Sequence, residues 1–304
     1  MVDYKRPNKI TTLWAAYDLT VACSPTWSNG SDYATNRKAC IRHIHDAEGS
    51  DQIKLKDINQ PWLRAVLEQY AEDRAERGLE TAPATLNQHI RAIRHVLKTA
   101  SQEGFLNAMP VFKEWSTNSV RTNYYTKEQV LMLTTFAAER DDLPMADIIK
   151  MAAFTGMRQG ELLKLRVRDV DWVNQCIHIG GTSETQTKAR NYRTVGMHDS
   201  LLTALEERTR GRERMGFIFD EFPNRKQLLR RYYKCRDRLI HETQNLIDKS
   251  YVFHTLRHTY GTLMIQAGTP LTDLRDLMGH STVSVTERYL HTTHDRRLQL
   301  ANVI

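Results

Sequence analysis

The chain has 304 residues, of which 40% are hydrophobic and 26% are charged. This composition excludes a disordered chain, and the length suits two globular domains with buried cores. Lysine and arginine outnumber aspartate and glutamate by 43 to 36, giving a formal net charge of +7, which favours a polyanionic partner such as nucleic acid, although many soluble proteins are mildly basic.

The first third of the chain is predicted to be helical. Apolar periodicity and helix-boundary residues indicate four helices, over 12–23, 32–47, 61–78 and 82–104. Proline and glycine break the chain after the first of them, and the third runs from Pro61 to Gly78.

The fourth helix carries two distinct faces. Its apolar face consists of Leu86, Ile90, Ile93, Val96 and Leu97. A basic stripe lies on a different face and consists of Arg91, Arg94, His95 and Lys98. Such a stripe can track DNA phosphates, and the alternative is an ordinary solvated polar face.

The sequence predicts a domain boundary after this helix. We expect a helical domain over 1–114, a linker over 115–125, and a second domain over 126–304. Thr126 and Gln129 form a capping-box pattern at the start of the second domain. That domain is predicted to be mainly helical with a small antiparallel sheet, an α+β pattern. Its expected strands are 176–181 and 192–197, with a middle strand and a tight turn between them.

The cysteines and the apolar runs bear on location. Cys23, Cys40, Cys176 and Cys235 show no zinc-knuckle or redox-pair spacing, and scattered thiols are typical of a reducing compartment. No apolar run approaches the roughly 20 residues of a membrane span, and the N-terminus lacks a signal-peptide core. We therefore expect a cytoplasmic protein without a membrane partner.

Four segments of the chain combine residues suited to phosphate chemistry. They are TGMRQGELLKLR (155–166), TKARNYRTV (187–195), HTLRHTYGTLMIQAG (254–268) and LMGHSTVSVTERYLH (277–291). Cleaving a phosphodiester without a metal needs a nucleophile, an acid for the leaving group, and cations around the phosphate oxygens. Taken together and in this order, the segments closely resemble the tyrosine recombinase family, which includes the phage integrases and the Xer-type recombinases. The helical first domain is similar in kind to the SAM-like core-DNA-binding domain of that family.

The resemblance implies a role for each matching residue. Arg158 and Arg257 correspond to the two family arginines, whose planar forks grip phosphate oxygens. Glu161, three residues after Arg158, would hold its guanidinium if the segment is helical. His254, three residues before Arg257, would share a helix face with it and exchange a proton near neutral pH.

The remaining matches complete the site. Gly279 is expected to end a helix in a left-handed turn and to present His280, which in the family donates a hydrogen bond to the scissile phosphate. Lys188 resembles the hairpin lysine that protonates the departing 5′ oxygen, although Gly196 stands where proline is frequent in the family. Tyr289 is then the nucleophile, and a phenol with an ordinary pKa near 10 needs neighbouring cations to react. An aromatic residue packed in the core is the alternative for Tyr289.

The resemblance implies a site-specific recombinase that forms a 3′-phosphotyrosine and releases a 5′ hydroxyl, most simply in phage or mobile-element integration and excision. The covalent bond conserves the energy, so no cofactor and no metal is expected. The alternatives are an Xer-like resolvase, a type IB topoisomerase and a non-catalytic helix-turn-helix regulator. Duplex DNA would be clamped between the two domains. A basic tail over 292–304 would dock on a neighbouring protomer in a homotetramer, or fold back as an intramolecular lid, and accessory DNA-bending or directionality proteins could take part.

Overall fold

The computed structural model describes residues 9–48, 52–117, 123–180, 192–243 and 247–290. The chain divides into two compact units, Met1–Ser119 and Val120–Ile304, called here the first and second units. Each has its own hydrophobic core. Within the described ranges, no helix is both long and apolar enough to cross a lipid bilayer.

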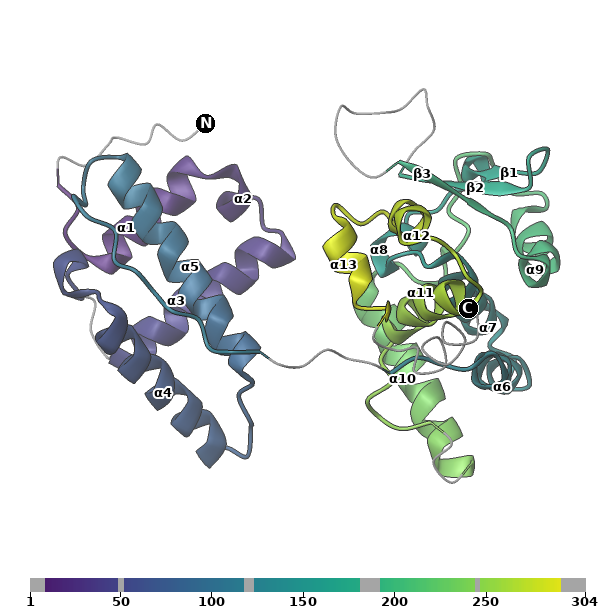
Figure 1. Ribbon diagram of the computed structural model, residues 1–304, viewed down its shortest axis with the longest axis horizontal. Coiled ribbons are helices and arrows are strands. Elements are labelled where there is room, and N and C mark those ends of the chain that lie inside the picture. The colour runs from purple at the N-terminus through teal and green to yellow at the C-terminus, as the bar shows by residue number, and fades with distance from the viewer. Residues whose placement is uncertain (1–8, 49–51, 118–122, 181–191, 244–246, 291–304) are drawn as a thin grey trace, which may run out of the picture. The chain divides into compact units, whose positions relative to one another are not determined.

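The elements of the first unit, in the part of the chain that the structure describes, are all helices or 3₁₀ turns (Figure 1). Its elements are α1 (Leu13–Cys23), α2 (Pro25–Ser28), α3 (Asp32–Glu48), the 3₁₀ turn η1 (Leu55–Asp57), α4 (Gln60–Glu76) and α5 (Pro83–Gln102). The four predicted helices are confirmed, each within two residues at either end. The side chains of Thr12 and Asn59 cap α1 and α4 by accepting hydrogen bonds from backbone amides of the first turn.

Helix α5 provides much of the core of the first unit. All five apolar residues predicted for its inner face are buried, and the helix packs against α1 and α3. The chain after α5 stays attached to it, because the Asn87 side chain donates to the Trp115 carbonyl at 2.9 Å and accepts from the Trp115 amide at 2.8 Å. Tyr125, ten residues later, is fully buried in the second unit and hydrogen-bonds Tyr232 through its hydroxyl.

The second unit is a helical body with a three-stranded sheet. Its helices are α6 (Lys127–Ala138), α7 (Leu143–Thr155), α8 (Gln159–Leu162), the 3₁₀ turn η2 (Val167–Asp169), α9 (Asp199–Thr209), α10 (Arg225–Glu242), α11 (Thr255–Gln266), α12 (Leu271–Met278) and α13 (Val283–Glu287). The predicted capping box at Thr126 and Gln129 is present. The fold class expected from the sequence, mainly helical with a small antiparallel sheet, is confirmed.

The sheet differs from the expected one in its third strand. Strands β1 (Val170–Asp171), β2 (Cys176–Ile179) and β3 (Arg193–Gly196) lie side by side in that order, all antiparallel. Strand β2 pairs directly with β3, with Ile177 opposite Val195, so no strand lies between them. The expected middle strand and turn fall on residues 182–191, which lie outside the described ranges. The third strand of the sheet is instead β1, which precedes β2 in the chain. It is only two residues long, too short to produce a recognisable alternation of apolar and polar residues.

Candidate active site

The first motif folds into a tight turn that presents Arg158. Helix α7 ends at Thr155, and Gly156 follows in the left-handed conformation with φ of 63°. A Cβ atom at Gly156 would lie 2.5 Å from Cδ1 of Tyr260, so both the backbone conformation and the space require glycine here. Arg158 then caps α8, and its Nη2 donates to the Gly279 carbonyl at 2.7 Å.

Glu161 holds Arg158, as their three-residue spacing predicts. Its carboxylate accepts from the Arg158 backbone amide at 2.7 Å and from Arg158 Nη1 at 3.0 Å. It also accepts from both terminal nitrogens of Arg193, at 3.0 and 2.7 Å. Burial alone would raise the pKa of Glu161, but the hydrogen bonds and charges of Arg193 and Arg158 outweigh it and bring the pKa to about 2. The carboxylate is therefore ionised at any physiological pH.

Arg257 lies in the first turn of α11 and is only 3% exposed. Its Nη1 donates to the Gly156 carbonyl and its Nη2 to the Met278 carbonyl, both at 2.5 Å. Burial and the charges of Arg158 and Arg193 lower its pKa to about 10, which leaves it protonated at neutral pH. Arg257 thus binds the turn at the end of α7 and the turn at the end of α12, and Arg158 binds the second of these turns as well.

His254 is the N-cap residue of α11, three residues before Arg257, and has helical dihedral angles, with φ of −65° and ψ of −18°. His254 is exposed, whereas Arg257 is buried. The ring of His254 meets that of His258 edge-on, with centroids 5.0 Å apart.

His280 and Tyr289 come together after α12. Gly279 ends α12 in the left-handed conformation, as predicted, with φ of 63° and ψ of 47°. His280 follows, and its Nδ1 lies 2.9 Å from the Thr286 hydroxyl. Its ring is nearly parallel to that of Tyr289, with an interplanar angle of 5° and centroids 6.3 Å apart. Burial and the charges of Arg257 and Arg158 lower the pKa of His280 to about 3, so its imidazole is neutral at pH 7.

Tyr289 is almost completely buried. Its side chain is 3% exposed and lies in the turn after α13, in a small cluster with Tyr260 and Ile265. Burial raises the pKa of its hydroxyl, while the charges of Arg257, Arg288 and Arg158 oppose that rise. A Cβ atom at Gly261 would lie 2.7 Å from Cζ of Tyr289, so this glycine makes room for the phenol.

Two contributors to this site escaped the sequence analysis. Gly261 carries no local pattern that announces its packing against Tyr289, which is 28 residues away in the chain. Arg193 did leave a signal, because it stands two residues before Val195 in a predicted strand and therefore on the same face. An arginine at an inward-facing strand position needs a buried partner.

The other expected site residues lie apart from this cluster or cannot be placed. Lys188 falls outside the described residues. In the first unit, Arg91 and Arg94 both bind Glu114, with closest distances of 2.5 and 3.1 Å. His95 packs against Trp27 with ring centroids 5.3 Å apart, and burial and nearby Arg37 lower its pKa. Lys98 is exposed.

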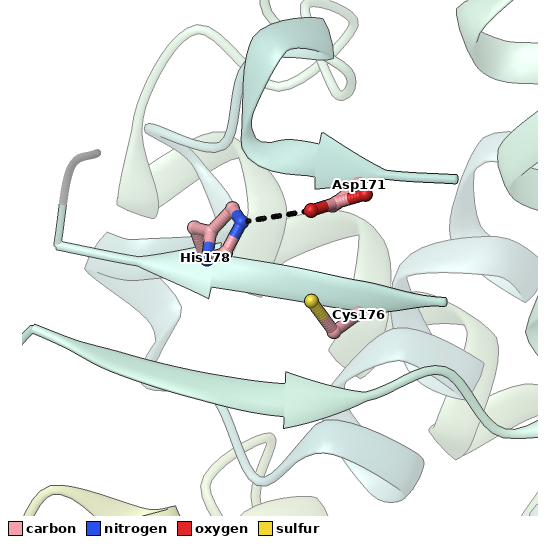
Figure 2. Close-up of side chains that lie close together, drawn as sticks. All are labelled: Asp171, Cys176 and His178. Atoms are coloured by element: carbon pink, nitrogen blue, oxygen red, sulfur yellow. Dashed lines mark ion pairs between the residues drawn. The ribbon is translucent and has the colours of Figure 1, made fainter. Parts of the chain in front are cut away.

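A separate group of possible metal ligands lies on the outer face of the sheet (Figure 2). The possible ligand atoms of Asp171, Cys176 and His178 lie within 4.8 Å of one another. Within the described ranges, this is the one group of three such side chains close enough to share a metal ion. His178 Nε2 pairs with Asp171 at 3.5 Å, and its Nδ1 lies 3.0 Å from the Tyr192 hydroxyl. These two contacts are enough to explain the orientation of the His178 ring without a bound metal.

Comparison with known proteins agrees with this architecture. Residues 123–296 match the Phage integrase family, and residues 26–117 match the Phage integrase SAM-like domain. The integrase of Staphylococcus phage L54a is 28% identical over 87% of this chain and 84% of its own length. The tyrosine recombinase XerC of Pelobacter propionicus is 24% identical over 84% of this chain and 82% of its own.

Solved structures with the same fold include two integrases bound to DNA. The Tn1549 transposon integrase in complex with a circular intermediate DNA has a TM-score of 0.67 at 20% identity, over 97% of this chain and all of that one. The lambda integrase dimer bound to a COC′ core site also has a TM-score of 0.67, at 17% identity, over 96% of this chain and 83% of that one.

A tyrosine-recombinase fold with a SAM-like helical domain before it is thus defined by the structure and by the family matches. The chain belongs to the phage integrase family. It is a tyrosine-type site-specific recombinase, which confirms the class expected from the four sequence motifs.

Proposed function

We propose that the chain is an integrase that cleaves and rejoins duplex DNA through a covalent bond between Tyr289 and a 3′ phosphate. The observation that carries this assignment is the convergence of four motif residues. Arg257 binds the carbonyls of Gly156 and Met278, and Arg158 binds the carbonyl of Gly279. His280 and Tyr289 follow the second of these turns, with their rings nearly parallel. Three segments far apart in the sequence thus supply two cations, a hydrogen-bond donor and a phenol.

The electrostatics of the cluster suit an anionic substrate. The charges of Arg257 and Arg158 lie close enough to the buried phenol of Tyr289 to oppose the rise of its pKa. A phosphate between them would gain charge-assisted hydrogen bonds in a site of low dielectric. His280, with Nδ1 accepting a hydrogen bond from the Thr286 hydroxyl, would carry its proton on Nε2 and donate a hydrogen bond from there to a non-bridging oxygen. Lys188 would protonate the departing 5′ oxygen, and His254 would exchange a proton with the nucleophile.

Tyr289 must become accessible before it can attack. Its side chain is 3% exposed, and its ring is covered by Gly261 on one side and by His280 on another. The attacking oxygen has to come within about 3–3.5 Å of phosphorus, which a buried phenol cannot do. We propose that binding of DNA rearranges residues 281–290 and so couples cleavage to assembly on the correct site.

The partners follow from the same proposal. Duplex DNA is the substrate, and the basic stripe of the first unit contacts its phosphates through Arg91, Arg94, His95 and Lys98. The proposed domains are 1–114 and 126–304, joined by 115–125. We further propose a homotetramer on DNA held by the tail over 292–304, a cytoplasmic location, and accessory DNA-bending or directionality proteins. If cooperative synapsis survived a truncation before Asp295, the tail would have no docking role.

A second candidate function is Xer-like resolution of DNA by the same chemistry. The XerC relative favours it, since that likeness spans 84% of this chain. The phage L54a integrase favours integration, with higher identity over a similar span. Reactions between two sites on separate molecules, compared with two sites on one molecule, distinguish the two functions.

A nicked suicide substrate tests the chemistry. A duplex selected from a random-sequence pool by binding to the Tyr289→Phe variant is nicked at successive positions, so that cleavage releases a short strand and traps the covalent complex. The unchanged protein is expected to give a covalent protein–DNA band, and Tyr289→Phe none, with DNA binding retained. Tyr260→Phe is the matched control, because Tyr260 lies in the same buried cluster and keeps its ring. A band that persists in Tyr289→Phe would refute the assignment of the nucleophile.

A further inference from the structure

Arg193 is a buried arginine on the inner side of a strand. It begins β3, is 6% exposed, and shares the inward face of that strand with the buried Val195. Placing a guanidinium there is costly unless every part of it finds a partner. The hydrogen-bond partners of the Arg193 guanidinium explain why an arginine is tolerated at this buried position.

The guanidinium of Arg193 connects two separate parts of the active site. Its two terminal nitrogens donate to the two oxygens of Glu161, at 3.0 and 2.7 Å, and Glu161 in turn holds Arg158. Its Nε donates to the Leu277 carbonyl at 2.7 Å, in the last turn of α12 and three residues before His280. One side chain is thereby bonded both to the residue that orients a proposed catalytic arginine and to the helix end that presents a proposed catalytic histidine.

Gly279 is shaped to admit this side chain. A Cβ atom there would lie 2.9 Å from Arg193 Nη1 and 3.3 Å from its Cδ. The left-handed conformation already favours glycine at this position, and the approach of Arg193 gives a second, independent reason for it. The end of α12 is therefore packed around the guanidinium.

We propose that Arg193 is a positioning residue for strand cleavage. This proposal rests on the proposed function. Arg193 fixes the position of Glu161, and through it that of Arg158, relative to the α12 turn that carries His280. Its own hydrogen bonds go to Glu161 and Leu277, and not to the proposed nucleophile Tyr289.

Lysine cannot take over this role. The planar fork of arginine makes a bidentate contact with a carboxylate while its Nε reaches a third acceptor, whereas an ammonium group is a single point of charge. Replacement by lysine keeps the charge next to Glu161 but loses the simultaneous bond to Leu277. Replacement by glutamine loses the charge as well. Arg193→Lys is therefore expected to disturb the positions of Glu161 and Arg158 less than Arg193→Gln does.

The test measures cleavage and DNA binding separately. With the selected suicide duplex at saturation, we expect the single-turnover cleavage rate of Arg193→Gln to fall about 10²-fold, the effect typical of a misplaced catalytic group. Arg193→Lys is expected to fall between that variant and the unchanged protein. DNA affinity is expected to change by less than about threefold, because phosphate contacts supply most of it.

Arg208 provides the matched control. It is also a buried arginine of the second unit, 8% exposed, and it is held by Asp147 at 2.7 Å and Glu221 at 3.1 Å. Arg208→Gln should lower the melting temperature as Arg193→Gln does, yet leave the cleavage rate unchanged at a temperature where both are folded. Equal cleavage rates in Arg193→Gln and the unchanged protein would overturn the proposal, as would an equal loss of rate in Arg208→Gln.

Amide hydrogen exchange gives a readout that does not depend on activity. Arg193→Gln is expected to increase exchange in peptides covering 156–162 and 276–282, while Arg208→Gln leaves both unchanged. Arg193→Lys serves the same purpose if the glutamine variant fails to fold. Unchanged exchange in both peptides would overturn the positioning role even if no variant cleaved. A missing covalent band in the unchanged protein would instead count against the proposed function.

Discussion

Glu114 in the first unit and Glu161 in the second each lie between two arginines, but the two clusters differ in how exposed their arginines are. In the first unit, Glu114 binds Arg91 and Arg94, whose side chains are 52% and 40% exposed. In the second unit, Glu161 binds Arg158 and Arg193, whose side chains are 38% and 5% exposed. The same residue types therefore form a surface network in one unit and, in the other, a network with one buried arginine.

The difference in burial predicts that the ion pairs of Glu114 break more easily than the ion pair between Glu161 and Arg193. Exposed ion pairs stabilise a fold by less than about 1 kcal/mol, so Arg91 and Arg94 can leave Glu114 for a DNA phosphate at little cost. A buried pair is costly to break from one side, since the remaining charge is left without a partner. The buried cluster is suited to holding Arg158 in one place, and the exposed cluster to exchanging partners.

Removing each glutamate is expected to give the largest contrast. Glu161→Ala leaves Arg193 buried without its carboxylate and should lower the free energy of unfolding by about 3–5 kcal/mol. Glu114→Ala, the matched change on the surface, should lower it by less than about 1 kcal/mol. Urea denaturation followed by circular dichroism measures both. Equal losses in the two variants would abolish the distinction between the clusters.

His89 tests burial without a carboxylate partner. It is 2% exposed, its Nε2 lies 3.1 Å from His43, and burial, with the charges of His43 and Arg74, lowers its pKa to about 4. The unfolded chain, with an ordinary pKa near 6.5, binds more protons between these values, so stability is full above pH 6.5 and falls as the pH drops towards 4. The loss is on the order of 3 kcal/mol.

The measurement is the free energy of unfolding of the first unit between pH 7 and pH 4. His89→Gln should flatten that dependence, because glutamine does not titrate. Glu161 behaves differently, since its pKa of about 2 is below the ordinary value and its contribution is kept until the pH falls below about 4.5. A pH profile of His89→Gln as steep as that of the unchanged protein would assign the effect to another group.

DNA binding should reveal the exchange of partners in the exposed cluster. Replacing Arg91 and Arg94 together by alanine is expected to weaken DNA binding about 10-fold at moderate salt and to reduce the slope of log affinity against log salt by about 2. Lys127→Ala is a suitable control, because Lys127 opens α6 in the second unit, outside the proposed stripe. An unchanged slope in the double variant would show that the stripe is an ordinary solvated face.

The smallest effect is expected from Glu114→Gln. Removing the competing negative charge frees both arginines and should strengthen DNA binding by a few-fold, in the direction opposite to the arginine variants. Fluorescence anisotropy with a labelled duplex at two salt concentrations measures it. Weaker binding in Glu114→Gln would mean that Glu114 arranges the arginines for DNA.

Local signals in the sequence were enough to predict much of the fold. Proline and glycine positions set the helix ends in the first unit, the Thr126–Gln129 capping box starts α6, and Gly279 ends α12 in the left-handed turn. Each of these features depends on residues within a few positions of one another. The motif residues of the site were identified by resemblance, and four of them lie in one cluster in the structure.

Features that depend on distant partners were not predictable. Strand β1 exists because two residues pair with β2, and its own sequence carries no alternation. Arg193 meets Glu161 across 32 positions, and Arg91 meets Glu114 across 23. The contact of Gly261 with Tyr289 is likewise long-range. Helix periodicity fixed the face of α5 correctly but could not show that its arginines already have a partner.

Peptide mapping of the trapped complex tests the central claim most directly. The covalent complex formed on the nicked duplex is digested with protease and nuclease, and the peptide that keeps a nucleotide is sequenced by mass spectrometry. The account predicts a single modified peptide, with the phosphate on Tyr289. A nucleotide on another residue, such as Tyr260, or cleaved DNA with no linked peptide at all, would contradict it.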